Sequence, residues 1–78
     1  MKTKPTKNTP APYEIRVVGH LSTNWSARFE GLSIRCEPDG GTVLSGMIDQ
    51  AALHGVLVKI RDLGLILISV NRVETEGF

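Results

Sequence analysis

Residues 49–70 read DQAALHGVLVKIRDLGLILISV, and this stretch decides the fold. Asp49 stands where a helix N-cap belongs, because its carboxylate can accept from the free amides of the first turn and lies at the positive end of the helix dipole. A helix is predicted to begin at Gln50 and to end at Gly64, a residue suited to the left-handed backbone that ends many helices. One apolar arc of this helix, which should cover a sheet face, collects Ala52, Leu53, Val56, Leu57, Ile60 and Leu63.

The second half of the stretch, LILISV at residues 65–70, is a continuous apolar run. Half-exposed strands alternate apolar and polar residues, whereas strands buried on both faces do not. The run therefore predicts a strand that is central in the sheet or buried on both faces. A strand, helix and strand in succession also imply a right-handed crossover that leaves the two strands parallel.

Three further strands are predicted upstream of this unit. YEIRVVGHL at residues 13–21 and LSIRCE at residues 32–37 alternate apolar and polar positions, which is the period of a β-strand. Pro38, Asp39, Gly40 and Gly41 form the best turn signal in the chain, so residues 42–48 should pair back on residues 32–37 as a hairpin. Between the first two strands, STNWSARFE at residues 22–30 predicts a short helix or turn.

The element order is thus strand, short helix or turn, strand, strand, helix, strand. We predict an α+β fold with a four-stranded, mainly antiparallel sheet and one principal helix, resembling a ferredoxin-like domain whose first helix is truncated. The short connection at residues 22–30 leaves a second arrangement open, in which the first three strands form a meander.

The length and composition of the chain limit the class of protein that it can be. The 78 residues are 41% hydrophobic and 22% charged, as in one small globular domain. Residues 1–12, rich in proline and lysine, predict a flexible basic tail ahead of a single domain at residues 13–78. Outside the tail, six basic side chains face eight acidic ones, so nucleic acid is not favoured as a partner. The sequence shows no membrane span or signal-peptide core and only one cysteine, which together predict a cytoplasmic protein without a membrane partner.

A four-stranded sheet with one real helix leaves a face that this chain does not cover. Apolar residues should occur on both faces of the last strand, and Val18, Val43 and Met47 should lie opposite their apolar neighbours. We therefore expect a homodimer, with another protein as the alternative partner. The interface is predicted at Ile66, Ile68, Val70 and Met47.

Four residues are candidates for binding a small ligand: His20, Trp25, Phe29 and His54. Trp25 and Phe29 lie four residues apart and could stack a flat molecule, although large aromatic residues more often close the open end of a small core. No spacing of histidine, cysteine or acidic residues indicates a metal site, a catalytic group or a cofactor. Cys36 alternates with Leu32 and Ile34, which predicts a buried thiol.

The stretch from Tyr13 to Val70 resembles a family of short, uncharacterised prokaryotic proteins. The shared motifs are Trp25 with Phe29, Glu30, Gly31 and Leu32, then Gly-Thr-x-Leu-x-Gly at residues 41–46, Asp-Gln-Ala-Ala-Leu-His-Gly at residues 49–55 and Arg-Asp-Leu-Gly-Leu at residues 61–65. The resemblance implies no activity. Within these motifs Gly55 is not explained by helix physics, and we expect it to admit a close contact with the Trp25 turn or with a neighbouring subunit.

These observations favour a non-enzymatic, intracellular, homodimeric interaction or regulatory module. The alternative is a small-ligand-binding or enzyme module similar to dimeric ferredoxin-like domains, with its pocket near Trp25 and Phe29.

Overall fold

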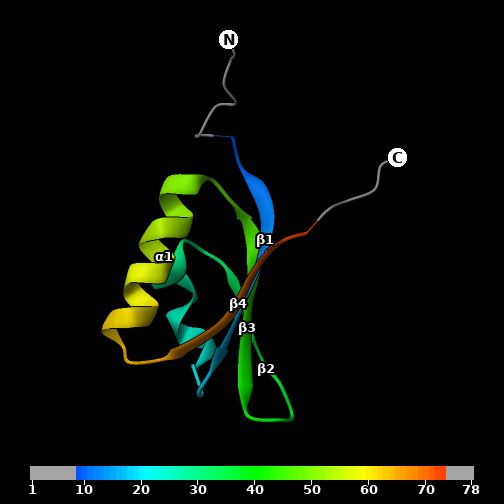
Figure 1. The fold of residues 1–78 in the computed structure, drawn as a ribbon, viewed down its shortest axis with the longest axis vertical. Coiled ribbons are helices and arrows are strands. Elements are labelled where there is room, and N and C mark those ends of the chain that lie inside the picture. Colours follow the sequence, from blue (N-terminus) through cyan, green and yellow to red (C-terminus); the bar gives the residue numbers. More distant parts are fainter. Residues whose placement is uncertain (1–8, 74–78) are drawn as a thin grey trace.

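The computed structural model describes residues 9–73, and it has the predicted α+β fold (Figure 1). In chain order the elements are β1 (Ala11–Val18), the 3-10 helix η1 (Thr23–Phe29), β2 (Ser33–Cys36), β3 (Gly41–Ile48), α1 (Gln50–Asp62) and β4 (Ile66–Arg72). Within the described range, no helix has the length and apolar character needed to cross a membrane.

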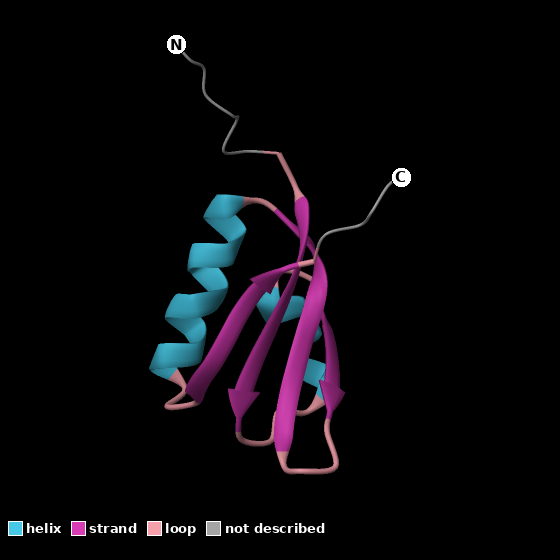
Figure 2. Cartoon of the chain, turned by 45° about the vertical axis from the view of Figure 1, so that its right-hand side comes forward, coloured by secondary structure: helices cyan, strands magenta, loops and turns pink. Residues whose placement is uncertain are grey.

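The strands form one sheet in the order β2-β3-β1-β4, and each neighbouring pair is antiparallel (Figure 2). Because β1 is antiparallel to both β3 and β4, these two run parallel with β1 between them, as the crossover through α1 predicts. β1 pairs with β3 and not with β2, so the meander is excluded. The finer resemblance to a ferredoxin-like domain stays a prediction.

β1 begins at Ala11, which is buried, so the strand includes the last two residues of the range predicted as a tail. The backbone amide of Val73 also donates to the carbonyl of Pro12 over 2.8 Å, which ties this end of β1 to the end of β4. The first eight residues of the expected tail and residues 74–78 lie outside the described residues.

The ends of α1 follow the sequence signals. The Asp49 carboxylate accepts from the amide of Ala52 over 2.8 Å, so Asp49 is the N-cap and Gln50 begins the helix. At the other end, Gly64 adopts a left-handed φ of 76°, which allows the amide of Leu65 to reach the carbonyl of Ile60 over 3.1 Å. The chain thereby reverses within a few residues and enters β4 beside the helix (Figure 1).

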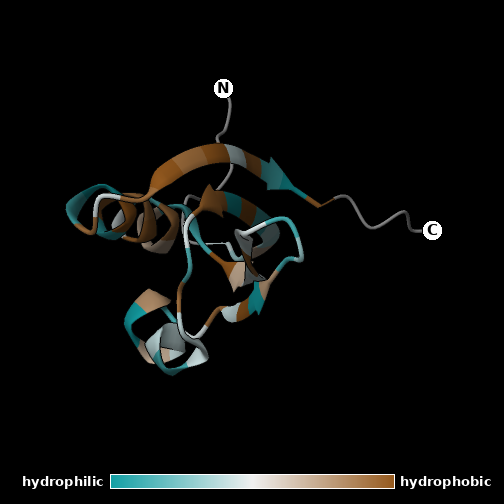
Figure 3. Ribbon diagram, turned by 90° about the horizontal axis from the view of Figure 1, so that it is seen from below, coloured by the Kyte–Doolittle hydropathy of each residue, from teal (hydrophilic) through white to brown (hydrophobic). Residues whose placement is uncertain are grey.

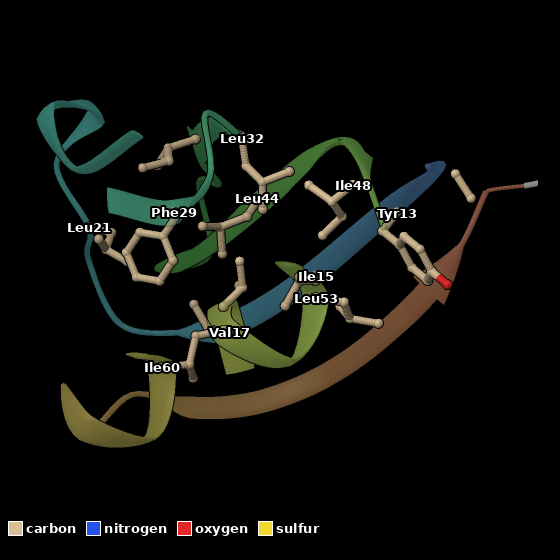
Figure 4. Close-up of a cluster of buried hydrophobic side chains, with 13 residues drawn as sticks. Tyr13, Ile15, Val17, Leu21, Phe29, Leu32, Leu44, Ile48, Leu53 and Ile60 are labelled. Carbon is tan, nitrogen blue, oxygen red and sulfur yellow. The ribbon is translucent and has the colours of Figure 1, made fainter. Parts of the chain in front are cut away.

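The core fills one face of the sheet, beneath α1 and η1 (Figure 4). Strand alternation places Tyr13, Ile15 and Val17 on this face of β1, and the register sets Leu44 of β3 opposite Ile15. Three residues of the helical arc, Leu53, Val56 and Ile60, are buried against them, and Phe29 is wholly buried beneath η1. Leu63, expected in the same arc, is 43% exposed because the helix has already ended at Asp62.

The other face of the sheet has no helix over it in the described chain (Figure 2). Its centre is polar and charged, with Glu14 and Arg16 on β1. Val43 lies on this face between Arg16 and Arg35 and is nonetheless buried, because arginine stems shield apolar neighbours. We call this surface the open face.

The prediction that the last strand is central or doubly buried is wrong. β4 lies at the edge of the sheet, and Ile66, Leu67 and Ile68 are all exposed. Figure 3 shows β4 as an outer ribbon that is apolar along its first half. A continuous apolar run indicates two apolar faces, but it does not say whether anything in the same chain covers them.

A register shift in β4 also changes which residues share a face. Val17 pairs with Leu67 and Arg16 with Ser69, which leaves Ile68 as an extra residue with no partner in β1. Ile66 is therefore on the open face, whereas Val70, opposite Ile15, packs against the core. The expectation that these two residues face the same way is wrong because the bulge reverses the alternation.

The packing of α1 predicts a large effect for one core truncation. Ile60→Ala should lower the free energy of unfolding by about 2–5 kcal/mol, because the cavity forms under the helix and cannot fill. The matched control is Val58→Ala on the outer side of the same helix, which should change stability by less than about 0.5 kcal/mol. Urea unfolding followed by circular dichroism, at one protein concentration, measures both. A loss below about 1 kcal/mol at Ile60 would contradict the assigned helix face.

Gly55 makes no close contact with the Trp25 turn, contrary to one expectation from sequence. A Cβ built on it meets no atom within 4 Å beyond its own helical backbone and chain neighbours. Gly55→Ala should therefore raise the free energy of unfolding by about 0.5–1 kcal/mol, because alanine has the higher helix propensity. Thermal unfolding checks this. A less stable variant, or one whose mass in solution changes, would instead assign Gly55 to a contact with a second subunit.

Candidate functional site

The 3-10 helix η1 presents two aromatic rings toward the end of α1. Ser22 caps η1 by accepting from the amide of Asn24, and the Ser26 hydroxyl donates to the carbonyl of Leu32 over 2.7 Å. The centres of the Trp25 and Phe29 rings lie 6.4 Å apart and the ring planes are tilted by 50°, so the two rings are within contact distance on one side of the helix. Phe29 is buried, and Trp25 is partly exposed above it.

Two adjoining hollows lie between η1 and the C-terminal end of α1, and we call them together the η1 groove. They share Trp25 and Leu63 in their walls, and each holds about 140 Å³. The first is also lined by Arg28, Phe29, Lys59 and Asp62, and the second by His20, Leu21 and Leu65. Pockets for drug-sized ligands and cofactors hold about 300 Å³ or more, so each hollow suits only a small fragment.

The charged residues of the groove lie at its rim. The Arg28 guanidinium stands 5.3 Å from the centre of the Trp25 ring, within the range of a cation–π contact. Lys59 adds a second positive charge from α1, and Asp62 is engaged by Arg61 at 3.2 Å. An anionic group with a small flat body is the chemistry that this wall of Trp25, Arg28 and Lys59 would accommodate.

The structure brings three of the four sequence-predicted ligand residues together. His20, Trp25 and Phe29 all line the η1 groove. His54 lies on the exposed side of α1 and lines neither hollow. Sequence reasoning missed Lys59, Asp62 and Leu63, because the end of α1 meets η1 only through tertiary packing and no local pattern signals it. It also missed Arg28, which lies on η1 between the two aromatic residues and could have been included by its place in the sequence.

Cys36 is exposed, so the prediction of a buried thiol is wrong. It is the last residue of the short edge strand β2, so its position at the end of an edge leaves it exposed although it alternates with buried Ile34. Its Sγ lies 3.6 Å from Nδ1 of His20 and also 3.6 Å from the carbonyl oxygen of Leu21. Among residues 9–73, no group of three or more histidine, cysteine or acidic side chains is placed to hold a metal ion.

The four residues predicted for a dimer interface do not lie on one surface. Met47 and Ile66 are exposed on the open face, at 63% and 64% of their full accessibility. Ile68 is exposed at the bulge, and Val70 packs against the core. Three of the four are therefore accessible, and two of those three belong to β4.

Comparison with known proteins gives one match. The family model described as "Domain of unknown function (DUF8691)" matches residues 12–71. Comparison with curated proteins gives no match, and comparison with solved structures gives none. The match is consistent with a resemblance to an uncharacterised family, while the shared motifs remain a prediction.

Proposed function

Because the chain belongs to the family described as "Domain of unknown function (DUF8691)", we propose its function from its surface: a non-enzymatic module that acts by forming a homodimer. The observation that carries this proposal is the row of exposed apolar side chains along β4. Its biological role is then regulatory or accessory, since a small module that binds its own copy acts by bringing attached or bound partners together.

The exposed residues of β4 differ from ordinary surface leucines and valines because they gather along one edge of the sheet, with Ile66 on the open face and Leu67 on the helix side. Ile66, Leu67 and Ile68 follow one another in the chain, and Ile66 pairs across the sheet with Val18, which is 47% exposed. Scattered apolar side chains on a surface need no explanation, but a contiguous group of them indicates an interaction site.

We propose a non-enzymatic function for two reasons: the η1 groove is small, and its charged groups are exposed to water. Each hollow is smaller than a typical substrate pocket, and Arg28 and Lys59 stand at a rim that is open to water. We also propose a reducing compartment, the cytoplasm, since the chain has a single cysteine and so no disulfide within it.

A second candidate function follows from the η1 groove itself. Trp25, Arg28 and Lys59 together offer an aromatic surface and two positive charges, which would suit a small aromatic anion. The module would then bind a ligand in addition to its own copy, as in dimeric ligand-binding domains.

The dimer is tested by its mass in solution. Wild-type protein at micromolar concentration should have twice the mass of one chain in light scattering or sedimentation. Ile66→Lys should shift the protein to the monomer while it stays folded by circular dichroism, because Ile66 is exposed in the single chain and buried in a dimer through β4. Val58→Lys, also at an exposed apolar position but on α1, is the control and should leave the mass unchanged. A wild-type protein that stays monomeric at all concentrations contradicts the proposal.

The ligand function is tested by the fluorescence of Trp25, the one tryptophan in the chain. Benzoate, as a small aromatic anion, should quench it with a saturable curve, and benzyl alcohol, which lacks the charge, should not. Lys59→Ala should weaken the benzoate effect by about tenfold if the carboxylate contacts this side chain. Linear quenching that is the same for both compounds and both proteins removes this candidate.

A further inference from the structure

The outer edge of β4 is open for hydrogen bonding. β4 pairs with β1 along one side, and within residues 9–73 no strand pairs with its other side. A strand at the edge of a sheet presents a row of amide and carbonyl groups that another strand can use. The partner that would satisfy the free amide and carbonyl groups of this edge is therefore a β-strand. An apolar surface alone would not satisfy them.

The two edges of the sheet differ in how they are protected. β2, at the other edge, has four residues, carries Arg35 in an ion pair with Glu37 at 2.8 Å, and is followed by Pro38. Short length, charge and proline are the features by which proteins block pairing at an edge. β4 has seven residues, and residues 63–71 contain neither a charged residue nor a proline. Of these two edges, only β4 is left available over a useful length.

We infer that two copies of this chain join along β4, strand to strand and antiparallel, so that one continuous sheet runs through both subunits. This inference rests on the proposed homodimer and assigns its interface. Antiparallel pairing of a strand with its own copy is the two-fold arrangement in which one patch meets the same patch. It sets the uncharged run of each chain against that of the other and leaves the two Arg72 side chains at opposite ends.

Pairing at the edge also accounts for exposure on both faces of β4. Ile66 is on the open face, while Leu67, opposite Val17, is on the helix side. Leu67 is 44% exposed there, and Leu63 at the end of α1 is 43% exposed. A second copy of β4 paired along this edge would place its own apolar side chains next to Ile66 on the open face and next to Leu67 on the helix side.

Packing the two open faces against each other is the competing geometry, and charge disfavours it. The centre of the open face holds the ion pair of Arg16 with Glu14 at 3.9 Å on β1, and Arg35 lies on β2, with β3 between the two strands. Arg35 forms its own ion pair with Glu37 at 2.8 Å, and the hydrogen bond to Glu37 raises the pKa of Arg35. Val43 lies between Arg35 and Arg16 in the sheet, so charged side chains extend across this face from β1 to β2. A face-to-face dimer would take these charged side chains out of water, whereas edge pairing leaves them solvated.

The bulge at Ile68 fits the same arrangement. Ile68 has no partner in β1 and is 57% exposed, so β1 does not cover it. Bulges can also twist an edge away from pairing. Here the residues on both sides of the bulge are apolar and exposed, and a second strand along the outer edge would bury Ile68 where β1 does not.

Two matched substitutions distinguish a dimer interface at the β4 edge from one on the open face. Ile68→Lys and Met47→Lys replace similarly exposed apolar residues, but Met47 is on β3, two strands from the β4 edge. Edge pairing predicts that Ile68→Lys raises the dissociation constant of the dimer by about tenfold or more, whereas Met47→Lys changes it less than about twofold. Sedimentation equilibrium measures both constants, with circular dichroism to check folding. The reverse pattern assigns the dimer to the open face and overturns the inference.

Amide hydrogen exchange, read residue by residue by NMR, gives a second measurement that does not need a variant. In a free edge strand, alternate amides of β4 donate to β1 and the others face water. In the proposed dimer both sets are slow to exchange, and dilution to the monomer restores fast exchange only in the outward set. If the protein is a dimer and the outward amides of β4 exchange fast, edge pairing is wrong but the proposed homodimer is not contradicted. A protein that is monomeric throughout overturns both, and leaves the edge to a strand from a different protein.

Discussion

The pairing of β1 on both of its sides is the constraint on which the rest of this structure depends. β1 is hydrogen-bonded to β3 along one side and to β4 along the other, and Ile15 and Val17 at its centre are completely buried. Because β1 occupies the space between β3 and β4, the connection through α1 must pass over it. The helix is thereby fixed above β1 and β4, where its apolar arc meets the core (Figure 4).

This arrangement determines which surfaces remain exposed. α1 and η1 both lie on one face, and the opposite face keeps water contact through charged side chains, including Glu14 and Arg16. β4 is the last element in the chain, and it lies at an edge of the sheet. The most apolar strand of the chain therefore lies where the described chain covers it least, and this contrast is the main support for the proposed dimer.

The η1 groove has a different origin. η1 is a seven-residue 3-10 helix and is too short to cover the whole of its side of the sheet, so a gap remains against the end of α1. Trp25 partly fills this gap, with Phe29 beneath it. A groove of this kind arises from covering a sheet with one long and one short helix, and the ligand binding proposed for it depends on the positive charges of Arg28 and Lys59.

Local sequence signals were sufficient to predict the order of the elements, the start of α1 and the inner face of β1. The N-cap at Asp49, the left-handed residue Gly64 and the alternation of Tyr13, Ile15 and Val17 are local signals, and they correctly predicted the two ends of α1 and the buried side of β1. Tertiary structure alone decided the position of β4 and the residues that meet η1. A run of apolar residues reports that both faces avoid water, but strand order decides whether a helix, a neighbouring strand or another subunit covers them. The bulge at Ile68 is equally invisible in the sequence, because it results from the register between β1 and β4, and it is what turns Val70 inward and leaves Ile66 outside.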